Sequence, residues 1–328
     1  MKYIGLQQQQ AKNNFKSTLL LFLFPCLVIV LFAIFCFLFT FLTRYSDESA
    51  EVVHYTETVS ETAISLFISY SPLVFGAVLI WFLIAFFSNT AIINHATGSH
   101  SLTRMENKRI YNLVENLCMS QGMTMPKINV IEDDSLNAFA SGINKKSYTV
   151  TLTRGIMNKL NDKELEGVIA HELTHIKNHD VRTLIISIVF VGIFSLIAQM
   201  ALRIAFHSGV RSKKDDKGGG ALIIIIVLIL AAVGYFFSVL MRFAISRQRE
   251  FLADAGAVEM TKRPDALAMA LRKISSDPVI EIVQREDIAQ LFIYHPMAAN
   301  GKKNVNFFNN LFATHPPIEQ RIEFLENL

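Results

Sequence analysis

One short stretch of the sequence combines residue types that can bind a metal ion and activate water. Residues 171–175 read HELTH, which places a histidine at each end, four positions apart. On an α-helix these positions point to the same side, so both imidazoles can bind one ion. Glu172 lies beside that face, where it can reach a water molecule instead of the metal. We predict His171 and His175 as metal ligands and Glu172 as a general base.

A catalytic zinc ion needs a third protein ligand and leaves its fourth position to water. The extended pattern HExxHxxGxxH fails, because Asn178 and Val181 stand where it requires glycine and histidine. His179 lies eight residues beyond His171, about 12 Å along a helix, which is too far to share an ion bound at ~2.0 Å. We interpret His179 as a surface residue or a supporting residue, and predict Glu250 as the third ligand.

Asp254 follows Glu250 by one helical turn and lies on the same face of the predicted helix. A carboxylate there can accept the free ring N–H of a ligating histidine and fix its tautomer. The alternative is a solvated acidic face. The hydrophobic hairpin 183–242 returns the chain to where it left, which favours a site shared by the two helices.

The polar parts of the chain predict several helices and a small sheet. Apolar residues recur at helical spacing over 104–121, whereas KINVIE, SLNAFASG and SYTVTLT are typical of short strands. Asn161 and Glu164 form a capping-box pattern at the start of the HELTH helix. Further helices are predicted in RQREFLADAGAVEM, DALAMALRKIS and IEQRIEFLENL.

Composition argues against an ordinary soluble enzyme. Of the 328 residues 52% are hydrophobic and 18% charged, against roughly 45–50% and about 25% in soluble domains. Four uncharged hydrophobic runs are long enough to cross a ~30 Å hydrocarbon core: 18–43, 66–88, Arg182 to Arg203, and Lys217 to Arg242. A net charge of +3 does not suggest nucleic-acid binding.

The distribution of charged residues predicts the topology. Three lysines precede the first run and five acidic residues follow it, so the N-terminus is expected inside and loop 44–61 outside. Loop 207–220 would lie outside in this topology, although it is rich in lysine and arginine. Either this loop is a tolerated exception to the charge rule, or the third and fourth hydrophobic runs form a re-entrant hairpin. The predicted parts are a cytoplasmic tail 1–17, two transmembrane helices 18–88, the first part of a catalytic domain 89–182, a hydrophobic hairpin 183–242, and the second part of the catalytic domain 243–328.

Three motifs together resemble the HtpX family of membrane-bound zinc metalloproteases, which are relatives of the CAAX prenyl proteases. They are HELTHIKNHD, EFLAD after a hydrophobic hairpin, and THPPIEQR. The expected fold is a polytopic membrane protein, mainly α with a small β-sheet, with about four transmembrane helices and a zincin-like (gluzincin) catalytic domain. The resemblance implies one Zn²⁺ per subunit at His171, His175 and Glu250. It also implies a bacterial inner membrane and stress-related cleavage of misfolded membrane proteins. The charge distribution described above predicts that the active site faces the cytoplasm.

The same resemblance implies residues that contact the substrate. NAFASG resembles a substrate-binding edge strand, so backbone pairing is expected from Asn137, Ala138, Phe139 and Ala140. His315, followed by two prolines, is expected to stabilise the developing oxyanion. Arg321 matches the second member of a His–Arg pair near the active site. His295, also before a proline, is the competing histidine.

Other functions are weighed against a zinc endopeptidase acting on polypeptides at the bilayer. A CAAX-type processing protease is less well supported, because the chain has four hydrophobic runs and shows no sign of a large intramembrane chamber. A non-catalytic zinc scaffold would not need Glu172, and a transporter would place more polar residues in its spans. An intramembrane protease would bury the HELTH segment in lipid, where its charged neighbours would each cost ~2.5–3.5 kcal/mol.

Overall fold

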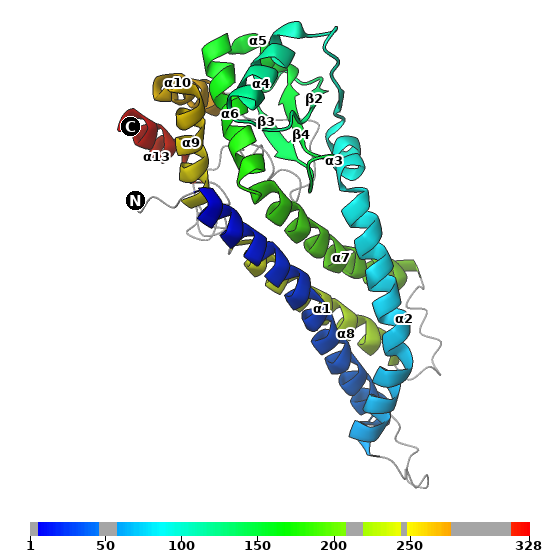
Figure 1. The fold of residues 1–328 in the computed structure, drawn as a ribbon. Coiled ribbons are helices and arrows are strands. Elements are labelled where there is room, and N and C mark those ends of the chain that lie inside the picture. The colour runs from blue at the N-terminus through cyan, green and yellow to red at the C-terminus, as the bar shows by residue number, and fades with distance from the viewer. Residues whose placement is uncertain (1–5, 46–57, 208–218, 244–247, 277–315) are drawn as a thin grey trace. The chain divides into compact units, whose positions relative to one another are not determined.

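A computed structural model describes residues 6–45, 58–207, 219–243, 248–276 and 316–328 (Figure 1). The chain divides into two compact units. Unit 1 consists of Met1–Ser17, Phe87–Ile188 and Phe243–Leu328, and unit 2 consists of Thr18–Phe86 and Val189–Arg242. In this division residues 6–17 belong to unit 1.

Unit 2 is built from the greater part of the long hydrophobic helices α1 (Leu6–Tyr45), α2 (Val59–Phe87), α7 (Asp180–His207) and α8 (Gly219–Phe243). The first turns of α1, up to Ser17, and of α7, up to Ile188, belong to unit 1. By length and composition three stretches in the described residues can cross a membrane, namely Ala11–Arg44, Val59–Ile84 and Asp180–Arg203, and α8 carries a shorter apolar stretch, Ile224–Phe237. Large apolar side chains such as Phe22 and Leu73 are exposed on these helices, as expected of surfaces that face lipid. A mainly helical membrane protein with a small sheet is thus confirmed.

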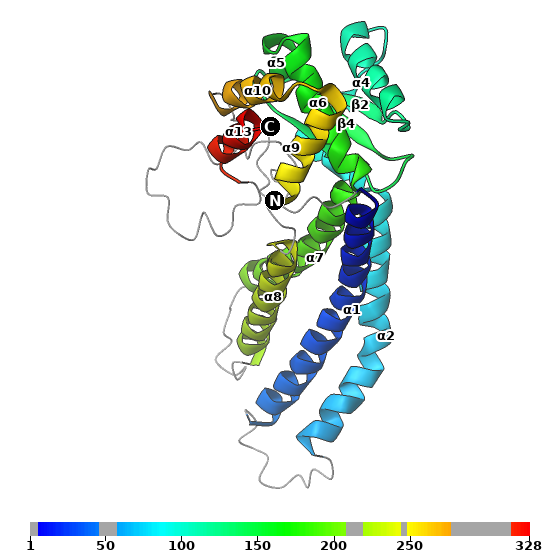
Figure 2. The same cartoon turned by 60° about the vertical axis from the view of Figure 1, so that its left-hand side comes forward.

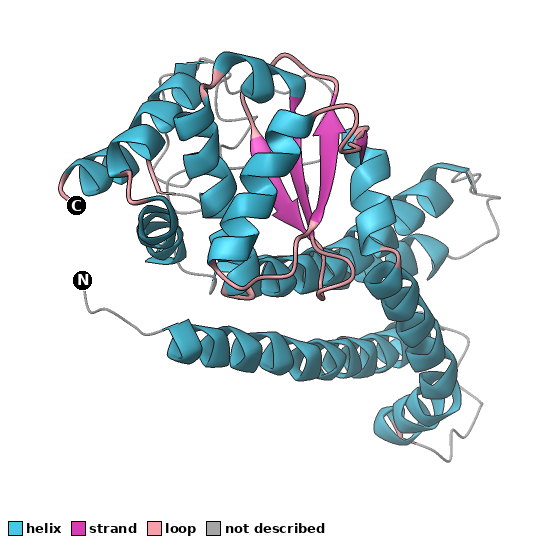
Figure 3. Ribbon diagram, turned by 45° about the horizontal axis from the view of Figure 1, so that its top comes forward, coloured by secondary structure: helices cyan, strands magenta, loops and turns pink. Residues whose placement is uncertain are grey.

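The sheet of unit 1 has four strands: β1 (His100–Ser101), β2 (Lys127–Ile131), β3 (Ala138–Ser141) and β4 (Thr149–Thr153). Their order is β1-β2-β4-β3, with β2 and β4 parallel and β3 antiparallel to β4 (Figure 3). The three longer strands match the predicted ones. Every residue of β4 is buried, so the centre of the sheet is covered on both faces. Helix α6 (Asp162–Lys177) packs against β3 and β4.

The helices of unit 1 begin where their sequences indicate. In α6 the capping box is complete, because the Asn161 side chain accepts from the Glu164 backbone and the Glu164 side chain accepts from the Asn161 backbone. Helix α4 (Lys108–Ser120) starts after an asparagine cap, and α10 (Pro264–Ser276) starts at its proline. Figure 2 shows α9 (Gln248–Thr261) and α10 beside α6, and α13 (Ile318–Glu326) packs against α9 and α10. The short helices α3 (Asn89–Thr97) and α5 (Arg154–Lys159) were not predicted.

Helix α9 approaches α6 closely because small residues line the contact. A β-carbon on Gly256 would lie 2.5 Å from Cγ2 of Thr174, so any larger residue there requires the Thr174 side chain or one of the helices to shift. Ala253 and Ala257 on α9 are fully buried. This close packing carries Glu250, at the start of α9, to the side of α6 that holds the HELTH segment.

The first turns of α1 differ from the predicted tail. Residues 6–17 are helical, and Asn13 and Ser17 are buried. The hydroxyl oxygens of Ser17 and Thr183 lie 2.7 Å apart. The helix extends through this segment because it contains neither proline nor a glycine and because its polar side chains find partners at the start of α7.

Candidate metal centre

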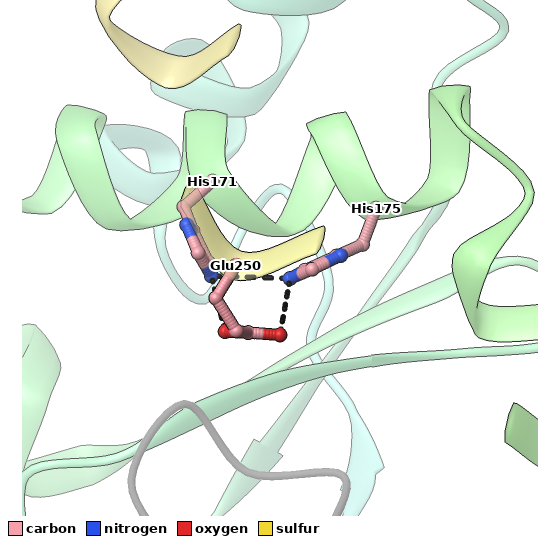
Figure 4. A group of neighbouring side chains, drawn as sticks. All are labelled: His171, His175 and Glu250. Carbon is pink, nitrogen blue, oxygen red and sulfur yellow. Dashed lines mark hydrogen bonds and ion pairs between the residues drawn. The ribbon is translucent and has the colours of Figure 1, made fainter. Parts of the chain in front are cut away.

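The structure brings the three predicted ligands together (Figure 4). The Nε2 atoms of His171 and His175 are 3.1 Å apart, and each lies 3.7 Å from a carboxylate oxygen of Glu250. The ligand atoms all lie within 4.8 Å of one another, the one such group among the residues that the structure describes. A tetrahedral ion with bonds of ~2.0–2.1 Å separates its ligands by about 3.3 Å. The three side chains are therefore spaced to hold a single ion of that size.

Asp254 supports the first histidine, as predicted. His171 is 1% exposed, and its Nδ1 lies 2.9 Å from Oδ1 of Asp254, so Nδ1–H donates to the carboxylate and Nε2 remains for a metal ion. Arg321 in turn holds Asp254 through two hydrogen bonds, of 2.7 Å from Nη2 and 2.9 Å from Nε. The sequence did not predict this pairing of Arg321 with Asp254.

Asp180 supports the second histidine, and the sequence analysis missed it. Its Oδ2 lies 3.0 Å from Nδ1 of His175, and its side chain is 3% exposed. Each imidazole therefore has a carboxylate on Nδ1 and its Nε2 in the triangle. The available signal was the last residue of HELTHIKNHD, an acid three residues after the end of α6.

Burial and neighbouring charges act differently on the two histidines. Burial, reinforced by the positive charge of Arg321, lowers the pKa of His171 to about 4. Burial also opposes the charged form of His175, but the carboxylates of Glu250 and Asp180 outweigh it and raise its pKa to about 9. His171 is therefore neutral at neutral pH, as a ligand must be, whereas His175 releases a proton when a metal ion binds.

Glu172, the predicted general base, is a buried residue of α6. It is 3% exposed and follows His171 directly in α6. Its negative charge contributes to the raised pKa values of both His175 and Arg321, which places it near both side chains.

The remaining predicted residues are distributed as follows. Asn137 precedes β3, and its carbonyl accepts from the backbone N–H of Thr153, while Ala138, Phe139 and Ala140 belong to β3. Nδ1 of His179 lies 2.9 Å from Oδ1 of Asn14, and His179 is not in the metal-binding group. His315 and His295 lie outside the described residues.

The fold and site define a membrane-anchored metallopeptidase, and comparison with known proteins gives its family. Peptidase family M48 matches residues 95–328, and the chain belongs to this family. It is 61% identical over 327 residues to the Protease HtpX homolog of Bacteroides fragilis, covering 99% of each chain. It is 42% identical over 262 residues to the Protease HtpX homolog of Listeria innocua, covering 77% of this chain and 84% of that one. The resemblance to the HtpX family is confirmed, and the protein is a bacterial membrane protease.

A solved structure is also similar. The crystal structure of S. mikatae Ste24p covers 79% of this chain and 58% of its own, with 20% sequence identity and a TM-score of 0.45. This likeness is too low to define the fold.

Proposed function

We propose that the protein is a zinc endopeptidase of the bacterial inner membrane that cleaves misfolded membrane proteins from the cytoplasmic side. The observation that carries this proposal is the triangle of His171, His175 and Glu250, with a carboxylate on Nδ1 of each histidine. Two imidazoles and one carboxylate are a donor set of catalytic zinc sites, and three protein ligands leave one position for water. We assign one Zn²⁺ to each subunit.

Each residue near the triangle has a distinct task in peptide hydrolysis. When bound, zinc acidifies water and polarises the scissile carbonyl. Glu172 accepts a proton from the attacking water and delivers it to the leaving nitrogen. Asp254 and Asp180 keep both imidazoles in the tautomer whose Nε2 lone pair faces the triangle. Arg321 keeps Asp254 ionised, because the guanidinium holds the pKa of that carboxyl below its ordinary value although burial opposes this.

The edge strand β3 is the proposed substrate-binding element. Thr153 donates to the Asn137 carbonyl, and antiparallel pairing alternates along a strand, so the backbone groups of Ala138 and Ala140 point away from β4. An extended polypeptide can pair with that edge through its backbone, without sequence preference. Ala138 and Ala140 are 1% and 4% exposed, and the Ala138 N–H donates to Oδ1 of Asn137, so pairing with a substrate requires this hydrogen bond to be exchanged.

Backbone pairing favours unfolded substrates, since a folded protein has already used its own backbone groups. A site tethered by membrane helices acts on chains that emerge from the bilayer. These two features support misfolded membrane proteins as substrates. His315 stays the proposed donor to the oxyanion, a role whose loss typically costs about 10²–10³-fold in turnover.

The cytoplasmic orientation rests on the three lysines before the first span and the five acids after it. Glu51→Cys in the acidic loop, in a cysteine-free background, should react with an impermeant thiol reagent in intact cells. Lys145→Cys should react only after the cells are opened. The reverse pattern would place the protease outside.

Catalysis is tested by Glu172→Gln in detergent-purified protein. The variant should retain one zinc ion per chain, because Glu172 is not a ligand, and lose cleavage of casein or of an unfolded membrane protein. Glu166→Gln, an acid on the exposed side of the same helix, is the matched control and should retain activity. More than a few per cent residual activity in Glu172→Gln would remove this residue from the role of base.

Neither alternative function is favoured. Two similar relatives are HtpX homologues and carry the name protease, which argues against a non-catalytic scaffold. A CAAX-type processing role would require prenylated substrates, and nothing in the described residues favours them over unmodified chains.

A further inference from the structure

A buried asparagine in the first hydrophobic helix lies close to the metal centre. Asn13 in α1 is 3% exposed. Its Nδ2 lies 2.7 Å from Oδ1 of Asp180 and 2.8 Å from the carbonyl oxygen of Asn178. Both partners can only accept, so the amide donates one hydrogen to each. The side chain thus joins the end of α6 to the first residue of α7.

Asp180 connects this amide to a metal ligand. While Oδ1 accepts from Asn13, Oδ2 accepts from Nδ1–H of His175 at 3.0 Å. The Nε2 of the same histidine belongs to the metal triangle. The hydrogen bonds therefore run without a break from the start of α1 to a ligand atom.

Two cations also lie near the Asp180 carboxylate, Lys16 and Arg249. Nη1 of Arg249 approaches Oδ1 only to 3.5 Å, and approaches the main-chain oxygen of Asp180 at 3.3 Å. The turn before Asp180 contains His179 at φ 60°, a left-handed conformation that is costly for a residue other than glycine. Asn13 binds both ends of this turn and so stabilises the conformation that aims Asp180 at His175.

We propose that Asn13 is a positioning residue of the metal centre, which acts by holding Asp180 in the orientation that fixes the tautomer of His175. On this view α1 is part of the metal-binding scaffold as well as a membrane anchor. The proposal rests on the proposed function, since it assumes a metal ion at the His171, His175 and Glu250 triangle.

Neighbouring contacts of the same helix supply matched controls. Oδ1 of Asn14 lies 2.9 Å from Nδ1 of His179, and Ser17 contacts Thr183. These contacts also join α1 to the start of α7, but neither residue bonds to Asp180. If the polar contacts of α1 serve only to pack helices, Asn13 and Asn14 should matter equally.

The test is Co²⁺ binding to the full chain in detergent, followed by the visible spectrum of the bound ion and by its dissociation constant. Asn13→Leu removes both donors at similar volume. Loss of a residue that orients a metal ligand typically weakens binding by 10–100-fold, so we expect about tenfold for Asn13→Leu, with a changed spectrum. Asn14→Leu should stay within about twofold of the unaltered protein. In an Asp180→Asn background Asn13→Leu should cause no further loss.

Three results would overturn the proposal: unchanged Co²⁺ affinity and spectrum in Asn13→Leu, an equal effect of Asn14→Leu, or an undiminished effect in the Asp180→Asn background. If Asn13→Leu is not recovered as folded protein, Asn13→Ser replaces it, and unchanged binding in that variant counts equally against the proposal. Absence of Co²⁺ binding to the unaltered protein would instead contradict the proposed metal site itself.

Discussion

Replacing Arg321 by methionine should destabilise unit 1 and weaken the metal centre together. Arg321 and Asp254 are 1% and 0% exposed, and two hydrogen bonds of 2.7 and 2.9 Å join them. Methionine fills a similar space without charge. The change leaves the Asp254 carboxylate buried beside His171 with no cation bound to it.

The magnitude follows from the burial of both partners. Removing one member of a buried ion pair typically costs about 3–5 kcal/mol, because the other charge is left uncompensated. In domains of 150–250 residues 1 kcal/mol corresponds to about 2–4 °C in Tm, so Arg321→Met should lower Tm by about 6–20 °C. The pKa of Asp254 should rise at the same time, since the Arg321 charge opposes the effect of burial. A protonated Asp254 is a poorer acceptor for His171, and metal affinity should fall by about 10–100-fold.

Thermal unfolding followed by circular dichroism, at saturating zinc in every sample, gives the change in Tm for Arg321→Met, Asp254→Asn and the double variant. Saturating metal matters because bound metal stabilises the folded state by mass action. The double variant removes both charges, so it should be clearly more stable than the sum of the single changes predicts. Arg272→Met is the control: its exposed ion pair with Glu326 should contribute at most about 1 kcal/mol. Strictly additive effects, or an Arg321→Met variant as stable as this control, would refute the reasoning.

Three further predictions concern packing, ligand choice and thiol reactivity. Gly256→Val should push α9 from α6, which should destabilise the protein by about 1–3 kcal/mol and lower its zinc content. Gly192→Ala is the control, because Gly192 has open space around it, and it should change neither stability nor zinc content. Melting curves and metal analysis measure both variants. Glu250→Ala should lose most bound zinc and His179→Ala should retain it, and the reverse result in metal analysis would exclude Glu250 as the third ligand. Burial raises the pKa of Cys118 to about 11, so its thiol should stay unlabelled by maleimide at pH 7 in folded protein; rapid labelling would show that α4 opens.

Sequence reasoning found the parts of the site whose geometry is local. The spacing of His171 and His175 on one helix, and of Glu250 and Asp254 on another, states directly which side chains share a face. The capping box of α6 is likewise encoded within four residues. Such relations need only the period of a helix, and the structure places these residues accordingly.

The features of the site that the sequence did not predict depend on contacts between segments that are distant in the chain. Asn13 and Asp180 are 167 residues apart, and nothing in either local sequence indicates the other. Arg321 was linked to the site by resemblance alone, and its partner Asp254 emerges only when α13 packs beside α9. The helical turns before residue 18 carry no amphipathic pattern that would distinguish them from a tail. Gly256 is one of many glycines in the sequence, and only the approach of Thr174 shows why it is required there.

The buried ionisable groups around the triangle have a consequence for which ion the site accepts. Glu172, Asp180, Glu250 and Asp254 supply four buried negative charges, and Arg321 supplies one buried positive charge. Arg249 and Lys16 are partly exposed and lie near Asp180. The buried groups thus carry an excess of negative charge, which in a region of low dielectric favours a cation over a neutral or anionic ligand. When the metal is removed, a proton on His175 can replace part of its charge.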